Sequence, residues 1–484
     1  MAVDRPSGRT PTERILAELC EKSFLSLWSY PHVYRDQGQL GGGDGKEVCD
    51  LMVVCGNDVI LFSVKYVKFP GAYNSPIAWS RWCKRAVVAS ARQLHGAERW
   101  LSWPDRLFVD AKCQQALPIS LPSPESRRVH RVVVALGAGE ACREYFGSGT
   151  GSLVVLPGLR GESHTNADNP DFAPFSIGDL DPERNYVHVL DDATLELLLS
   201  ELDTVTDFIC YLNEKEWFIR SDHLVTAAGE EELLGYYLAH TNANGEHAFV
   251  PLSGRDSWEP TEYCTLSEGI WETTKNSPQF RAKREADKVS YLWDEMIEKF
   301  ARHLIDGTAR VEDPVGTPIA HFEQALRVMA LESRFERRIL AAQIVAAIDN
   351  GLPDRRYARI IGLYEPPRNR AAYVFLQLPF NASSGAPDYE KYRQYRSANL
   401  HAYCLVVKAD YPSIPRVLAI GTEPPKFSGG IKTSEDILML EVGDWGAEHQ
   451  READELRERF EILSPRTLSL TTISESEYPD TDSE

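Results

Sequence analysis

The stretch Lys46–Lys68 reads KEVCDLMVVCGNDVILFSVKYVK, and it decides the fold of the first part of the chain. Two runs rich in Val, Ile and Leu, Val48–Cys55 and Val59–Val67, flank Gly56-Asn57-Asp58, whose residue types favour tight turns. Two apolar runs joined by such a turn predict a β-hairpin.

Two ionisable residues interrupt the apolar pattern of this hairpin. Asp50 lies near the start of the first run, and Lys65 lies inside the second. A lysine in an apolar strand is costly unless it has a partner, so Asp50 on the adjacent strand is its predicted partner. Strand alternation places Ser63 and Lys65 on the same face.

This arrangement resembles the active-site hairpin of the PD-(D/E)xK nuclease superfamily, in its nuclease-related and Mrr-like branches. There an Asp on one strand is followed by acid-x-Lys on the next, and here Asp50 is followed by Ser63-Val64-Lys65. The resemblance covers about the first quarter of the chain. It implies an α/β fold with a restriction-endonuclease-like mixed sheet flanked by helices. Ser63 departs from the family pattern, because it stands in the place of the second acid.

The resemblance also implies a Mg²⁺ or Mn²⁺ site, with Asp50 and the backbone carbonyl of Val64 as hard oxygen ligands. The Ser63 hydroxyl would reach the ion directly or through water, and Lys65 would orient the attacking water. With one carboxylate on the hairpin, we expect one tightly bound ion rather than two. Glu13 or Glu47 would restore the missing charge, and Glu47 ranks lower because strand alternation separates it from Asp50.

The first helix offers a further candidate ligand. Thr10-Pro11-Thr12-Glu13 predicts a helix start with Thr10 as N-cap, and the helix is expected to run to about Tyr30. Glu13 matches a glutamate that the family carries in its first helix, so two interpretations stand: a metal ligand, or only the acid of a capping box. Glu18 on the same helix is the alternative ligand.

A basic helix is predicted after the hairpin, over Trp79–Leu101. Its polar side is either an exposed face or a surface that contacts phosphates. The resemblance makes Gln93 a candidate polar group near the metal, and an exposed helix residue is the other interpretation. The candidate nucleic-acid-binding residues are Arg81, Lys84, Arg85 and Arg92.

Charge is distributed unevenly. The whole chain carries a formal net charge of −20, but residues 1–150 hold 19 Lys and Arg against 15 Asp and Glu. The remainder holds 33 against 57. A local basic surface can bind phosphates while an acidic remainder restrains non-specific binding.

Other sequence patterns indicate the expected cellular location of the protein and its expected partners. No run of 18 apolar residues predicts a membrane span, and the first residues lack the apolar core of a secretory signal. Nine cysteines without a C-x-x-C pair indicate reduced thiols, so we expect a cytoplasmic protein. No nucleotide P-loop appears, so an ATP-driven step would need a separate NTPase partner.

The sequence predicts four regions: a nuclease-like domain (1–221), a mostly helical connector or oligomerisation region (222–355), a small α/β domain (356–466) and an acidic disordered tail (467–484). Further strands are predicted at 131–137, 152–157, 186–190, 372–378, 402–408, 416–420 and 436–441. Further helices are predicted at 191–212, 389–401 and 447–460.

The predicted function is a metal-dependent endonuclease acting on DNA, with RNA as an open alternative and a homo-oligomer as the expected assembly. A role in bacterial antiviral defence or restriction follows from family association alone. The alternative is an inactive nuclease-like module that binds nucleic acid or protein, in which Ser63 is the trace of lost catalysis.

Overall fold

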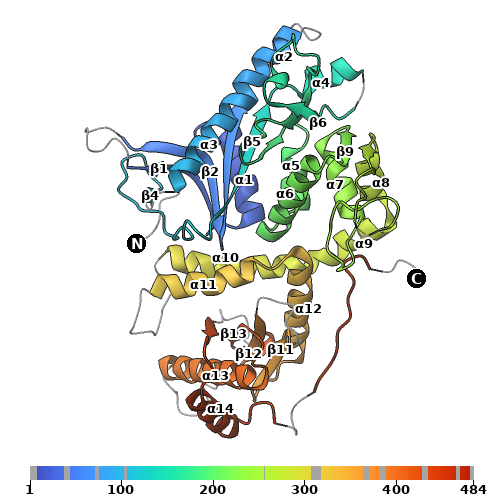
Figure 1. Cartoon of the computed structure of the whole chain (residues 1–484). Coiled ribbons are helices and arrows are strands. Elements are labelled where there is room, and N and C mark those ends of the chain that lie inside the picture. The colour runs from blue at the N-terminus through green and yellow to red at the C-terminus, as the bar shows by residue number, and fades with distance from the viewer. Residues whose placement is uncertain are drawn as a thin grey trace. The chain divides into compact units, whose positions relative to one another are not determined.

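The computed structural model of the chain is shown in Figure 1. It describes residues 8–36, 44–70, 76–102, 106–147, 149–255, 257–306, 318–363, 371–380, 389–427, 434–464 and 469–479. These residues form a mixed α/β fold with three sheets, which confirms the predicted α/β class. Every helix in the described ranges is too short or too polar to cross a bilayer.

The chain divides into two compact units, Met1–Ala282 and Lys283–Glu484. This division differs from the boundaries that the sequence predicts at 221 and 355. Residues 224–227 and 264–266 explain part of the difference, because they are strands of a sheet in the first unit rather than parts of a helical connector.

The first sheet of the first unit has the strand order β4-β1-β2-β3-β5-β8. β1, β2 and β3 form an antiparallel meander, and β5 and β8 continue the sheet in parallel with β3. The predicted hairpin is therefore confirmed as β2 and β3. The strands are β1 (Ser29–Arg35), β2 (Lys46–Cys55), β3 (Asp58–Tyr66), β4 (Leu107–Phe108), β5 (Arg128–Leu136) and β8 (Val187–Leu190).

The first helix is α1 (Pro11–Phe24), and its start is as predicted: Thr10 is the N-cap and forms a capping box with Glu13. Its predicted end near Tyr30 is wrong. Leu25 takes a left-handed φ of 65°, which ends the helix. The following Ser29–Arg35 segment is strand β1, whose aromatic side chains are buried in the sheet.

The basic helix is confirmed, with an internal irregularity. It runs as α2 (Pro76–Cys83), a π-helical turn η2 (Lys84–Val88) and α3 (Ala89–Leu101). Such π-turns occur frequently at functional sites. In Figure 1, α3 crosses one face of the first sheet and α1 lies behind it. The Phe24 and Phe62 rings, 6.4 Å apart, identify the α1 face of β3.

The second sheet of the first unit has the order β10-β9-β6-β7. The single helix predicted over 191–212 is wrong, because Leu202 ends one helix and the Thr204 side chain caps a second. The strands are β6 (Val154–Arg160), β7 (Ser176–Asp179), β9 (Leu224–Ala227) and β10 (Cys264–Leu266), and the helices are α4 (Gly139–Phe146), α5 (Leu195–Glu201), α6 (Val205–Arg220), α7 (Glu230–Ala239) and α8 (Ile270–Asn276).

The second unit contains a sheet of order β11-β12-β13-β14. One correction falls here: the strand predicted at 402–408 is part of the long helix α13, whose apolar residues pack into the core beside the sheet. The strands are β11 (Tyr357–Ile361), β12 (Ala372–Gln377), β13 (Arg416–Thr422) and β14 (Glu435–Glu441), and the helices are α9 (Pro278–Asp287, which spans the boundary), α10 (Tyr291–Ile305), α11 (Pro318–Ala330), α12 (Arg334–Asn350), α13 (Tyr389–Asp410) and α14 (Ala447–Phe460).

The predicted disordered tail lies only partly within the described residues. Residues 469–479 are described and contain neither helix nor strand, while 467–468 and 480–484 lie outside the described ranges.

Candidate functional site

Asp50 lies at the position where the regular pairing of β2 with β3 ends. Regular pairing of the two strands runs from Cys55 to Leu51, and its register would place Asp50 opposite Ser63. Here the hydrogen-bond acceptor for β3 is a side chain rather than the main chain: the Val64 N–H donates to Asp50 Oδ2 at 2.7 Å. The carboxylate is therefore fixed at the open end of the hairpin.

Ser63 is fully buried beside Asp50. Its exposed fraction is 0%, and its Oγ has no hydrogen-bond partner of ordinary geometry among the described residues. The hydroxyl is nevertheless near enough to Asp50 to favour the ionised carboxyl. A buried hydroxyl without a bond is uncommon and calls for an explanation, such as a water or an ion that completes the site.

Lys65 does not form the predicted ion pair. No ion pair between Lys65 and Asp50 occurs in the described part of the chain, and Asp50 is bonded to Val64 instead. Lys65 is half-buried and the next residue, Tyr66, is exposed. Because the end of β3 reaches solvent, the ammonium group needs no buried carboxylate as a partner.

The surroundings of Asp50 disfavour its charge. Burial raises the pKa of the Asp50 carboxyl, and the carboxylates of Glu47 and Glu13 raise it further, whereas the Val64 N–H and the Ser63 hydroxyl lower it. A buried carboxylate with a raised pKa near other acids is typical of functional sites, and a bound cation would relieve this repulsion.

The structure shows the capping role of Glu13, and its role as a metal ligand stays a prediction. Its Oε2 accepts hydrogen bonds from the backbone N–H groups of Arg9, at 2.8 Å, and Thr10, at 3.0 Å, so it does cap the helix. The same carboxylate acts electrostatically on Asp50. Glu18, the alternative ligand, is exposed farther along α1 and lines neither of the two pockets beside the hairpin.

His32 on β1 is a site residue that the sequence did not indicate. It is 2% exposed, with Nδ1 2.5 Å from Glu47 Oε1 and Nε2 3.5 Å from Glu13 Oε2. Its φ of 52° is unusual for a non-glycine residue, and strained residues of this kind cluster at functional sites. Pro31 and Val33 pair with Leu51 and Cys49, so His32 occupies the position opposite Asp50.

An open pocket of about 840 Å³ gathers several of the predicted residues. It lies between the start of α1, the end of β3 and the π-helical turn. Lys84 and Arg85 are exposed, and no ion pair to either occurs within the described residues. The predicted site residues that line it are Glu13, Val64, Lys65, Lys84 and Arg85.

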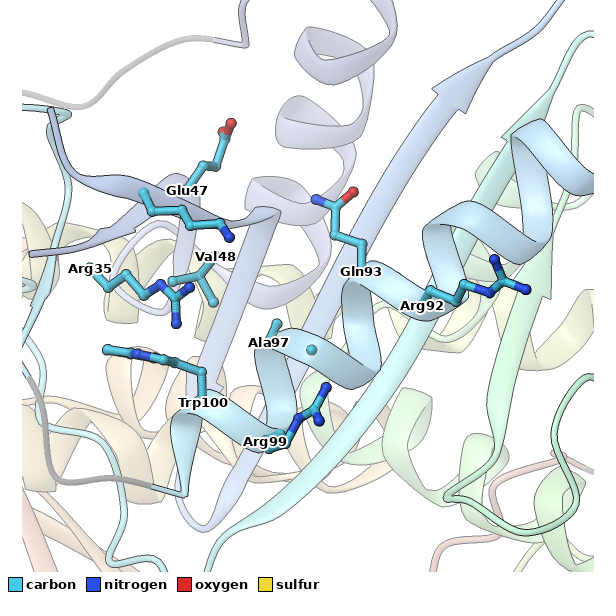
Figure 2. Close-up of a pocket in the computed structure, with 10 residues that line it drawn as sticks. Arg35, Glu47, Val48, Arg92, Gln93, Ala97, Arg99 and Trp100 are labelled. Atoms are coloured by element: carbon cyan, nitrogen blue, oxygen red, sulfur yellow. The ribbon is translucent and has the colours of Figure 1, made fainter. Parts of the chain in front are cut away.

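A second pocket, of about 540 Å³, holds three other predicted residues: Glu47, Arg92 and Gln93. Figure 2 shows Gln93 extending from α3 toward the side of Glu47, whereas Arg92 points away from it along the helix. Arg81 is exposed on α2 and lines neither pocket.

The oxygen donors near Asp50 are too few to surround a hard divalent cation without bound water. No group of three or more His, Cys, Asp or Glu side chains that could hold a metal occurs in the part of the chain that the structure describes. The donors that remain are one carboxylate, the Ser63 hydroxyl and the Val64 carbonyl, which in an extended strand faces the same way as the Val64 N–H. Mg²⁺ commonly binds through one or two carboxylates and keeps several waters, so this set fits one hydrated ion.

Comparisons with protein-family models, with curated proteins and with solved structures found no match to this chain. The case for a function therefore depends on the residues themselves.

Proposed function

We propose that the first unit is a Mg²⁺- or Mn²⁺-dependent nuclease that hydrolyses phosphodiester bonds of DNA. The observation that carries the proposal is the bond from the Val64 N–H to Asp50, at the open end of a hairpin that also carries Lys65. The resemblance of this hairpin to the PD-(D/E)xK superfamily supports the same reaction class.

The residues have distinct roles in this proposal. Asp50 and the Val64 carbonyl would hold the ion, and Ser63 would complete the site through its hydroxyl or a water. A bound divalent ion would neutralise developing charge on the phosphate and make a water nucleophilic. Lys65 orients that water and stabilises the charge of the transition state. Lys84 and Arg85, exposed at the same pocket, bind the flanking phosphates.

Cleavage of plasmid, linear duplex, single-stranded DNA and RNA, each with Mg²⁺ and with Mn²⁺, tests the proposal. Lys65→Ala should lower the cleavage rate by about a hundredfold or more while circular dichroism stays unchanged. Lys68→Ala, which removes an exposed lysine three residues further on, is the matched control. Wild-type rates in Lys65→Ala would overturn the assignment.

An inactive nuclease-like module that binds nucleic acid or protein is the second candidate. It is favoured by the serine at position 63 and by the lack of a three-residue metal group in the described ranges. Calorimetric titration with Mn²⁺ separates the two candidates. The nuclease should show one site that Asp50→Ala abolishes and that Ser63→Glu retains or strengthens, whereas the inactive module should show no site.

A further inference from the structure

The pocket in Figure 2 lies between the start of β2 and helix α3. Val48 lines it and lies two residues from Asp50 on the same strand, β2. Two residues of strand span only about 7 Å. A ligand in this pocket would therefore be a direct neighbour of the candidate active site.

The charged lining of this pocket is predominantly basic. It presents Arg35, Lys46, Arg92 and Arg99 against one acid, Glu47. Arg92 and Arg99 are exposed on α3, and neither has an ion pair within the described residues. Clustered cations of this kind bind the oxygens of a phosphate group.

The pocket also contains a flat stacking surface. The guanidinium of Arg35 lies over the ring of Trp100, 5.0 Å from the ring centroid. Figure 2 shows the two groups together at one end of the pocket. Aromatic rings and arginine planes are the surfaces on which proteins stack unpaired bases.

Gly96 lines the pocket. It lies within α3, where glycine costs about 1 kcal/mol of stability relative to alanine. A Cβ added at Gly96 would have no atom within 4 Å among the described residues, so close packing does not require the glycine there. Gly96 shares the lining of the pocket with Arg92, Arg99 and Trp100, and a Cβ there would enter open space.

We infer that this pocket is a subsite for one phosphate-bearing nucleotide, with its base on the Arg35–Trp100 pair and its phosphate beside Lys46 and Arg99. This inference rests on the proposed function, because it takes a nucleic-acid strand as the source of that nucleotide. The substrate would then be a strand with an unpaired base beside the scissile bond.

Binding without a divalent ion tests the subsite separately from catalysis. Fluorescence anisotropy and calorimetry in EDTA would use oligothymidylates with a 5′-phosphate, with a 3′-phosphate and with neither, together with thymidine 5′-monophosphate. Gly96→Glu and Gly96→Gln fill the pocket, whereas Gly96→Ala adds one methyl group into open space. All three residues favour the helix more than glycine does, so the fold should be retained.

We expect Gly96→Gln to raise the Kd by about tenfold, Gly96→Glu to raise it further, and Gly96→Ala to leave it unchanged. Binding of the mononucleotide alone would identify a free nucleotide as the ligand, and binding of the oligonucleotides only would identify a strand or its end. Unchanged affinity in both filling variants, or no binding by the wild type, would overturn the subsite. If Gly96→Gln loses binding but the wild type cleaves nothing with Mg²⁺ or Mn²⁺, the subsite stands and the nuclease proposal fails.

Discussion

At the scale of single residues, His32 shows how the backbone can bring acids together. Its left-handed φ turns the imidazole away from the regular strand direction, and the two ring nitrogens face Glu47 and Glu13. Both carboxylates act electrostatically on Asp50, and replacing groups that surround a metal ligand typically changes metal affinity by about 10- to 100-fold.

We therefore expect His32→Asn to weaken Mn²⁺ binding by about tenfold or more. Asparagine tolerates a positive φ, so the backbone of β1 should keep its course. Calorimetric titration measures the effect. The matched control is His95→Asn, which replaces a buried histidine on α3 that bonds to the Asn185 carbonyl. Equal Mn²⁺ affinity in the two variants would show that His32 has a packing role only.

A second residue-scale prediction concerns Asp191, which is buried and accepts hydrogen bonds from the Leu153 N–H at 2.7 Å and the Thr194 hydroxyl at 2.8 Å. Burial raises the pKa of Asp191 to about 7, above the ordinary value of about 3.9. The protonated form is therefore favoured in the folded state. The stabilisation of the folded state by protonated Asp191 is complete below about pH 4 and is lost as the pH rises through 7.

Asp191 should accordingly reduce the free energy of unfolding of the wild type by about 2 to 3 kcal/mol between pH 5 and pH 8. Asp191→Asn removes the titrating group, so its unfolding free energy should fall less over the same range. Urea titrations at both pH values measure the difference. Parallel pH profiles for the two proteins would contradict the raised pKa.

At the scale of elements, the sequence correctly predicted the helices and strands whose formation depends on a local residue pattern. The hairpin, the capped start of α1 and the basic helix all follow from turn residues, capping residues and periodicity. Ser29–Arg35 was missed because its pairing with β2 is long-range, and His32 was missed with it. The run at 402–408 is buried in the core, and such apolar runs suit a buried helix as well as a strand.

The candidate site was predictable to a similar extent. Glu13, Lys65 and Arg85 came from sequence motifs and do line one pocket. The ion pair of Lys65 with Asp50 was wrong, because strand spacing does not reveal that the two strands part at this point. The Arg35–Trp100 pair had no sequence signal, since the two residues come from separate elements.

The basic helix carries a prediction about salt. Replacing Arg81, Lys84 and Arg85 together with Ser should weaken DNA binding and flatten the slope of log K against log salt by up to about three units, because each neutralised phosphate contributes about 0.9. Anisotropy titrations over a range of salt measure the slope, and Asp50→Ala should leave it nearly unchanged.

The matched control for that triple variant removes three other exposed cations of the first unit, Arg160, Arg184 and Arg255. Each of them is ion-paired to a carboxylate, to Asp222, Asp181 and Glu262 respectively. The change in net charge is the same in both triple variants. If both flatten the slope equally, the effect is one of overall charge, and the DNA phosphates bind at residues other than Arg81, Lys84 and Arg85.

At the scale of the whole molecule, the end of the chain returns to the helices of the second unit. The Arg338 guanidinium on α12 donates to the main-chain carbonyls of Ser476, at 2.6 Å, and Glu477, at 3.1 Å, and also to the buried Asp287. Lys283 lies 3.4 Å from the Glu477 carboxylate. The acidic tail, predicted to be disordered, is therefore held at this point by a buried cation.

Removing residues 474–484 should lower the free energy of unfolding by about 1 to 3 kcal/mol, because hydrogen bonds to the charged Arg338 are lost. A synthetic peptide of residues 469–484 should restore the lost stability, since the main-chain carbonyls that it offers are the same. Removal of 480–484 alone keeps both carbonyls and serves as the control. Thermal unfolding followed by circular dichroism measures all three proteins. If the longer truncation leaves stability unchanged, or if the peptide has no effect on it, the contact with Arg338 does not hold the tail in solution.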